Sequence, residues 1–229
     1  MGSRWSSLER KLRQQHGDQT LIAGVDEVGR GPLAGPVVAC AAIMPASSAR
    51  RAIAGVDDSK QLPAAERERL AARIRRDALA IGVGAASVRE IDTYNIYHAS
   101  VRAMRRALAR LALPPDHVLV DGLPIRSLGI PHTAVVNGDA RCYAIACASI
   151  VAKVTRDELM RRLARRYEAY GWDHNCGYAT PDHIAVLDAL GATPHHRVSF
   201  RVKQLELDLA HVPFDGTGAA DAAAAVAGR

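Results

Sequence analysis

The sequence predicts an α/β protein in which helices pack against a mixed central sheet. Two features of the pattern indicate this class. Strand candidates come first, around residues 20–44, and strand and helix candidates then alternate along the chain. The size and composition agree, because 229 residues with 48% hydrophobic and 24% charged side chains are typical of one large soluble domain.

The first two strands flank a loop rich in glycine and proline. Buried aliphatic residues predict a strand at residues 21–25, which ends on Asp26 and Glu27, and a second strand at residues 37–44. The loop between them, residues 29–36, favours an antiparallel hairpin that opens the sheet.

Helices and shorter strands follow the hairpin. The segment at 95–111 is amphipathic, with Met104 and Leu108 on its apolar face and arginines on the opposite face. Pro63 suits the start of a helix that ends near residue 78. Helices are predicted at residues 7–15, 63–78, 95–111, 140–170 and 181–190, and strands at 80–88, 117–120 and 133–136.

Composition divides the chain into three parts. Residues 1–19 form a polar extension, residues 20–208 the globular domain, and residues 209–229 an Ala- and Gly-rich tail expected to be disordered. No signal peptide and no run of about 18 apolar residues is visible, so a cytoplasmic location is expected. The cysteine spacing fits neither a zinc site nor a disulfide framework, which predicts buried free thiols at Cys40, Cys142, Cys147 and Cys176.

The chain is basic, with a formal charge of +6 and a pI near 9.4. Clustered arginines attract polyphosphates, but they also occur on solvated helix faces, and charge alone leaves both interpretations open. The two clusters are Arg102, Arg105, Arg106 and Arg110, and Arg161, Arg162, Arg165 and Arg166. Asp157 and Glu158 stand four residues before Arg161 and Arg162, a spacing that predicts helical ion pairs.

Acidic residues follow three strands of the predicted sheet. Asp26 and Glu27 close the first strand, Asp121 follows residues 117–120, and Asp139 follows residues 133–136. Ligands of open α/β sheets bind beyond strand ends, so these side chains can converge. Converging carboxylates repel one another unless cations separate them, and oxygen ligands favour Mg²⁺ or Mn²⁺. Two such ions suit phosphodiester cleavage.

Each acid also has a structural interpretation. Asp139 directly precedes a helix and can serve as its N-cap. Asp121 with Gly122 is a common turn pair. The pair Asp26 and Glu27 is harder to explain without a functional role, because it closes a run of buried aliphatic residues.

The motifs of the chain resemble the type 2 ribonucleases H, and bacterial ribonuclease HII in particular. The longest match is GVDEVGRGPLAGPV at residues 24–37. The other matches occur in the order of the family, from DSK at 58–60, VDG at 120–122 and GDA at 138–140 to ASIVAKVTRD at 148–157, GY at 177–178 and HRVSF at 196–200.

This resemblance implies an RNase H-like fold with a helical C-terminal part. It also implies cleavage of the RNA strand of RNA/DNA hybrids and nicking on the 5′ side of ribonucleotides in duplex DNA, which leaves 3′-hydroxyl and 5′-phosphate ends. Removal of misincorporated ribonucleotides and of replication RNA primers would follow. The resemblance also implies a monomer. The expected cofactor is a pair of Mn²⁺ or Mg²⁺ ions at the active site.

The resemblance also assigns roles to individual residues. Metal-binding and catalytic positions are matched by Asp26, Glu27, Asp121 and Asp139. Substrate-binding positions are matched by Gly29, Arg30, Gly31, Lys60 and Tyr178; the first three match a ribose-sensing loop, Lys60 a phosphate contact and Tyr178 a stacking residue. Two departures are Arg141, where many relatives have lysine, and Ala179, where proline is common.

Three alternatives remain at this point. Ribonuclease HIII usually has a long additional N-terminal domain, whereas about 20 residues precede the first strand here. A hybrid-binding module without activity would be expected to lack one of the four acids. A nucleotide-binding protein would need the GxxxxGK[ST] spacing, which the loop at 29–36 does not have.

Overall fold

A computed structural model of the protein describes residues 7–46, 52–56 and 62–200. By its contacts the chain separates into a large unit, Met1–Arg197, and a short one, Val198–Arg229; the fold given below is that of the large unit. The predicted phosphate contact Lys60 and the predicted tail at 209–229 lie outside the described residues. Among the described helices, none is long and apolar enough to cross a membrane.

The centre of the large unit is a five-stranded mixed sheet with the order β3-β2-β1-β4-β5. The strands are β1 (Ile22–Val28), β2 (Val37–Ile43), β3 (Ala80–Ala86), β4 (His117–Asp121) and β5 (Thr133–Val135). β2 pairs antiparallel with both β1 and β3, whereas β4 is parallel to β1 and to β5. The predicted hairpin and the mixed sheet are therefore confirmed.

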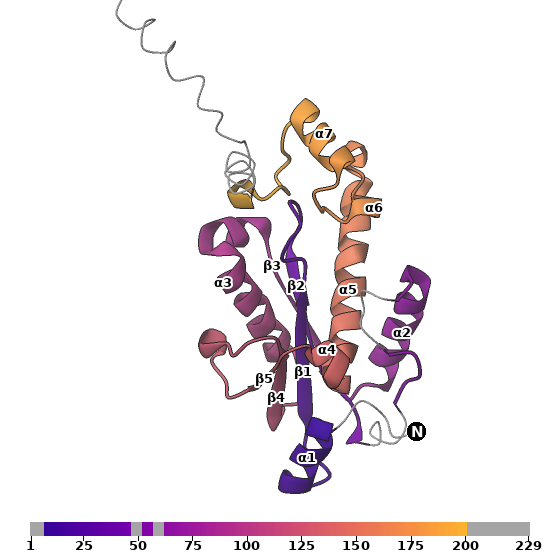
Figure 1. Cartoon of the computed structure of the whole chain (residues 1–229), viewed down its shortest axis with the longest axis vertical. Helices are drawn as coiled ribbons and strands as arrows, with labels where there is room; N and C mark the ends of the chain where they lie inside the picture. Colours follow the sequence, from indigo (N-terminus) through magenta and orange to yellow (C-terminus); the bar gives the residue numbers. More distant parts are fainter. Residues whose placement is uncertain (1–6, 47–51, 57–61, 201–229) are drawn as a thin grey trace, which may run out of the picture. The chain divides into compact units, whose positions relative to one another are not determined.

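Helices cover both faces of the sheet (Figure 1). α3 packs on β2 and β3 from one side, and α5 packs on β1 and β2 from the other, with α2 beside it. The C-terminal part of the unit is helical, as predicted. The helices are α1 (Ser7–His16), α2 (Ala64–Asp77), α3 (Val88–Ala109), α4 (Gly138–Arg141), α5 (Tyr143–Ala164), α6 (Trp172–Asn175) and α7 (Pro181–Leu190), with 3₁₀ turns η2 (Arg126–Leu128) and η3 (Glu168–Tyr170).

Two predicted helices have different bounds in the structure. The helix expected from residue 95 begins at Val88, because Ser87 and Glu90 form a reciprocal capping box at its start. Asn95 interrupts it with a left-handed φ of 66°, and its side chain accepts a hydrogen bond from the His98 amide, so the helix starts again. The helix expected over 140–170 is broken at Cys142, which is extended (φ −127°, ψ 122°), and α5 ends at Ala164.

α5 lies directly on β1 because the strand has a glycine at the point of contact. A Cβ atom at Gly24 would lie 2.1 Å from the carbonyl carbon of Ala144 and 2.3 Å from the amide nitrogen of Ile145. Only a residue without a side chain therefore allows this spacing. A chain with 4% aromatic residues can build its core in this way, from small side chains packed at short distances.

The N-terminal helix α1 contributes a buried acid to the same junction. Glu9 is 4% exposed, and its carboxylate accepts hydrogen bonds from the amides of Tyr143 and Ala144 at 3.3 and 3.1 Å. These amides belong to the first turn of α5, where backbone donors lack partners within the helix. A segment that reads as a polar extension in the sequence thus caps the central helix.

Three of the four cysteines are buried and Cys176 is partly buried, and all four are free thiols, as the spacing predicts. Burial raises the pKa of each thiol above its ordinary value. These thiols therefore remain protonated at neutral pH and serve as small apolar side chains of the core.

Substitution of Gly24 tests the contact between α5 and β1. Gly24→Ala should lower the free energy of unfolding by about 3 kcal/mol or more, the upper end for overpacked cores, because the methyl group meets backbone atoms that cannot rotate away. Thermal and urea unfolding would measure this loss. Gly31→Ala is the matched control, since its Cβ has no neighbour closer than 3.8 Å. Equal melting temperatures for the two variants would contradict the interpretation.

Candidate active site

The sheet brings two of the predicted acidic positions together. β1 and β4 are parallel neighbours with Val25 opposite Val120, so Asp26 and Asp121 follow at adjacent positions. β1 continues through Asp26 and Glu27 to Val28 and does not end before the acids. Asp26 is 7% exposed and has no ion pair among the described residues, which is unusual for a carboxylate.

A tight turn delivers Asp139 to the same place. Asn137 has left-handed backbone angles (φ 54°, ψ 45°) and occupies the N-cap position of α4, so the alternative that Asp139 is the N-cap is wrong. The Gly138 amide donates a hydrogen bond of 2.7 Å to Asp121 Oδ1. A Cβ atom at Gly138 would lie 2.6 Å from Ile145 Cδ1 and 3.1 Å from that same oxygen. A side chain at position 138 would therefore crowd Ile145 and Asp121, so glycine suits the close approach of the turn.

These acids and the Gly-rich loop line one cavity of about 290 Å³. All predicted site residues within the described chain are among its lining residues. They are Asp26, Glu27, Gly29, Arg30, Gly31, Asp121, Asp139 and Tyr178, joined by Val28, Ser149 and Lys153. The structure thus collects residues from β1, β4, α4, α5 and the turn after α6 around one hollow.

The carboxylates of the cavity oppose one another's ionisation. Burial, followed by the charges of Glu27 and Asp121, raises the pKa of Asp26 well above its ordinary value. Burial also raises the pKa of Glu27, although Arg30, 3.1 Å from its carboxylate, acts in the opposite direction. A cation between the carboxylates would relieve this repulsion, so the donor set fits a hard, oxygen-preferring metal ion.

Backbone amides orient several of these carboxylates. Asp26 Oδ1 accepts from the Glu27 amide at 2.7 Å, and Asp139 Oδ1 accepts from the Ala140 amide at 2.9 Å. Within residues 7–46, 52–56 and 62–200, no three acidic, histidine or cysteine side chains already surround one point as a metal site. The carboxylates therefore line a common hollow without closing on its centre.

Two residues of α5 that the sequence pattern did not single out also belong to the site. The Ser149 side chain forms a hydrogen bond with Asp26, and the Lys153 ammonium lies 2.7 Å from Asp157 Oδ1 at the cavity wall. Their spacing of four residues in an otherwise apolar helix is the signal that could have identified them. The predicted ion pair between Asp157 and Arg161 is wrong, because Asp157 bonds to Lys153.

The arginine clusters form many contacts inside the protein. On α5, Arg161 pairs with Glu68 at 2.7 Å, and Arg162 pairs with Glu158 as predicted. On α3, Arg102 and Arg106 both bond to Glu90, and Arg105 donates to the Leu128 carbonyl. Arg106, and Arg110 at the C-cap of the helix, donate to the carbonyls of Ala85 and Val83 on β3. These arginines therefore make contacts within the protein, as the structural interpretation of the positive charge expects.

Comparison with known proteins places this chain in a family. Residues 23–203 match the family model described as ribonuclease HII. The ribonuclease HII of Granulibacter bethesdensis is 57% identical over 188 residues, which cover 81% of this chain and 86% of that protein.

Two solved structures share the fold. The ribonuclease H2 of Pyrococcus horikoshii OT3 has a TM-score of 0.71 and 26% identity, and the match covers 84% of this chain and all of that one. Bst-RNase HIII, solved in complex with Mn²⁺, has a TM-score of 0.66 and 21% identity, with coverage of 84% and 71%. The fold is therefore that of the type 2 ribonucleases H, and by the extent and identity of its sequence matches the chain belongs to the ribonuclease HII family.

Proposed function

We propose that this enzyme, a ribonuclease H by family, cuts the RNA strand of RNA/DNA hybrids and also nicks duplex DNA on the 5′ side of embedded ribonucleotides. The products would have 3′-hydroxyl and 5′-phosphate ends. The observation that carries the proposal is the cavity in which four carboxylates face the Gly-rich loop and Tyr178. In the cell this activity would remove misincorporated ribonucleotides and RNA primers.

Asp26, Glu27, Asp121 and Asp139 would hold two Mn²⁺ or Mg²⁺ ions. When bound, such ions activate a water nucleophile and stabilise the leaving oxygen of an in-line displacement. The protein supplies the orientation of the ligands, since the amides of Glu27 and Gly138 fix one oxygen each of Asp26 and Asp121. Ser149 supports Asp26 through a further hydrogen bond.

The loop residues Gly29, Arg30 and Gly31 would recognise the ribose. The 2′-hydroxyl is the group that distinguishes RNA from DNA, and glycines let backbone groups approach it closely. Tyr178 lies beside the loop, since a Cβ atom at Gly31 would be 3.8 Å from its Cε1 atom. It is 43% exposed and lines the cavity, so its ring is accessible for stacking on the neighbouring sugar. Lys153, at the cavity wall, provides positive charge close to where the phosphate would bind.

A labelled DNA duplex with one ribonucleotide tests the proposal. With Mn²⁺ or Mg²⁺, we expect a nick on the 5′ side of the ribonucleotide and no cut in an all-DNA duplex, with gel analysis of the end groups as the readout. Cleavage of long hybrids alone would contradict ribose sensing at junctions. Binding without cleavage of any duplex by folded protein would favour a hybrid-binding module instead.

Asp26→Asn separates the catalytic from the structural effect of the carboxylate. Cleavage should fall by more than about 100-fold, since even the loss of an outer-shell metal partner typically costs about 10–100-fold. Without metal, the variant should be more stable than the wild type at pH 8. The raised pKa of Asp26 means that its ionisation opposes folding of the wild type. The protonated carboxyl group therefore contributes stability below the unfolded-state pKa, and this contribution is lost as pH rises through the folded-state pKa.

Melting curves at pH 8 and near pH 4 measure this effect in metal-free protein, and the difference from the wild type should shrink at the lower pH. Glu90→Gln is the matched control with the opposite sign, because Arg106 lowers the pKa of Glu90 to about 2 and its charged form stabilises the fold at neutral pH. A metal-free Asp26→Asn that melts below the wild type at pH 8 would contradict carboxylate repulsion.

A further inference from the structure

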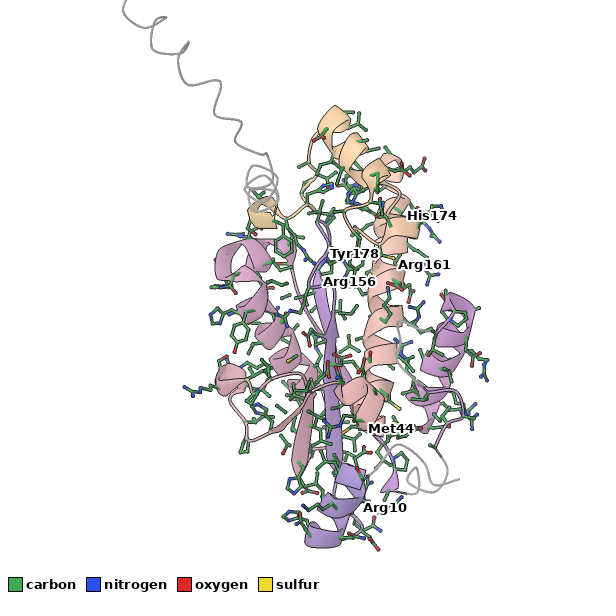
Figure 2. All side chains as sticks on the ribbon, in the orientation of Figure 1. Arg10, Met44, Arg156, Arg161, His174 and Tyr178 are labelled. Atoms are coloured by element: carbon green, nitrogen blue, oxygen red, sulfur yellow. The ribbon has the colours of Figure 1, made fainter. Side chains whose placement is uncertain are left out.

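Two arginines are buried beneath the Gly-rich loop at residues 29–36. Arg156, on α5, is 0% exposed, and Arg197, near the end of the large unit, is 1% exposed. Figure 2 shows Arg156 close to Tyr178, beside α5. Burying a guanidinium group carries a large desolvation penalty unless its N–H groups find acceptors. The hydrogen bonds of these two side chains show what they hold.

Arg197 joins the beginning of the loop to its end. Its guanidinium donates to the carbonyl of Gly29 at 2.6 Å, to that of Arg30 at 2.9 Å, and twice to that of Gly35, at 2.8 and 3.0 Å. The Arg197 amide also donates to the Leu33 carbonyl at 2.8 Å. The side chain of Arg197 therefore joins the backbone at the two ends of the loop and restricts its conformation.

Arg156 joins the end of the loop to the turn that carries Tyr178. It donates to the carbonyls of Ala34, Pro36 and Cys176, each at 3.0 Å. The amides of Leu33 and Ala34 reinforce this connection, because both donate to the Gly177 carbonyl. These hydrogen bonds thus hold the loop and the turn that carries Tyr178 together.

The contacts of Arg197 determine the direction of two backbone donors. All described peptide bonds are trans, so the N–H of each peptide group points away from its carbonyl. Because the Gly29 and Arg30 carbonyls bond to Arg197, the amides of Arg30 and Gly31 point away from it. Neither amide has an acceptor among the described residues, and both residues line the cavity.

We propose that Arg197, assisted by Arg156, is a positioning residue for ribose recognition. By drawing the carbonyls of Gly29 and Arg30 inward, it aims the amides of Arg30 and Gly31 at the position of the 2′-hydroxyl oxygen and holds them there before substrate binds. This inference rests on the ribose-sensing role proposed for residues 29–31. Preorganised donors lower the entropy loss on binding, so the guanidinium acts on affinity for the ribonucleotide through the loop.

The energetics support a functional role for the two side chains. Burial, followed by the like charge of Arg156, lowers the pKa of Arg197 to about 9. The charged form of Arg197 is therefore held at an energetic cost. An apolar side chain would fill the same volume without this penalty. It would leave the carbonyls of the loop without donors, and only the planar fork of an arginine reaches three of them from one position.

The test compares Arg197→Lys with the wild type on the duplex that contains one ribonucleotide. Lysine keeps the charge but has one nitrogen in place of three, so the loop should loosen. We expect kcat/KM to fall about 10-fold or more, while the Mn²⁺ concentration at half-maximal rate stays within about twofold. Arg10→Lys is the matched control and should leave both unchanged, since Arg10 lies on α1 at the lower end of the view in Figure 2, well below Tyr178.

Chemical rescue distinguishes hydrogen bonding by the guanidinium group from simple filling of space by the side chain. Arg197→Ala should regain activity with millimolar guanidinium and not with methylammonium, because only guanidinium has the fork of donors. Arg156→Lys and Arg156→Ala, which release the carbonyls of Ala34, Pro36 and Cys176, are made in parallel. The variants that fold, as judged by a cooperative melting transition, are then assayed, whether the substitution is at position 156 or at position 197.

Gly31→Ala separates the two proposals, because it alters the loop surface without a clash inside the protein. If Gly31→Ala lowers kcat/KM and Arg197→Lys does not, the positioning role is overturned and ribose sensing stands. If neither variant has an effect, both are overturned. A shift of the Mn²⁺ dependence in Arg197→Lys would also overturn the positioning role, since the arginine would then act on the carboxylates.

Discussion

The contact between the backbone of α5 and Gly24 of β1 is the constraint on which the site depends. It sets the distance between helix and strand, and α5 then presents a different group at each successive turn. Ser149 supports the carboxylate of Asp26, Lys153 lines the cavity, and Arg156 reaches the carbonyls under the Gly-rich loop. Because one rigid helix carries all three, the acids and the loop keep a fixed spacing. Glu9 stabilises the start of the same helix from α1.

Local pattern was sufficient to predict much of the architecture. The hairpin around the Gly-rich loop, the helix Pro181–Leu190 and the acids on neighbouring strands all have signals within a few residues. The helical turns that precede Asn95 were missed because the expected helix began at that residue, and the break at Cys142 was missed because it ends one helix and starts another inside a segment of helical composition. Periodicity averages over such a junction and does not detect a single residue with non-helical backbone angles.

Contacts between distant parts of the chain could not be predicted from local pattern. Arg197 is separated from Gly35 by 162 residues, and its motif offers no sign that its partners are backbone carbonyls. Ser149 and Lys153 face the cavity only because α5 packs at Gly24 with a particular rotation. The charge of the chain was ambiguous for a related reason: most arginines of α3 bond to β3, to Glu90 or to the Leu128 carbonyl, which no count of charges reveals. Sequence gives the type of a side chain, whereas the fold decides what it touches.

The bonds from α3 to β3 have a consequence for the solubility of the protein. β3 is an edge strand, and an unpaired edge can add a strand from another chain and begin aggregation. Arg106 and Arg110 donate to the carbonyls of Ala85 and Val83 on this strand, so these acceptors are already engaged. The two guanidinium groups also place positive charge along that border, where a second copy would bring the same charge. The helix that covers one face of the sheet therefore also protects its margin against self-association between copies of the enzyme.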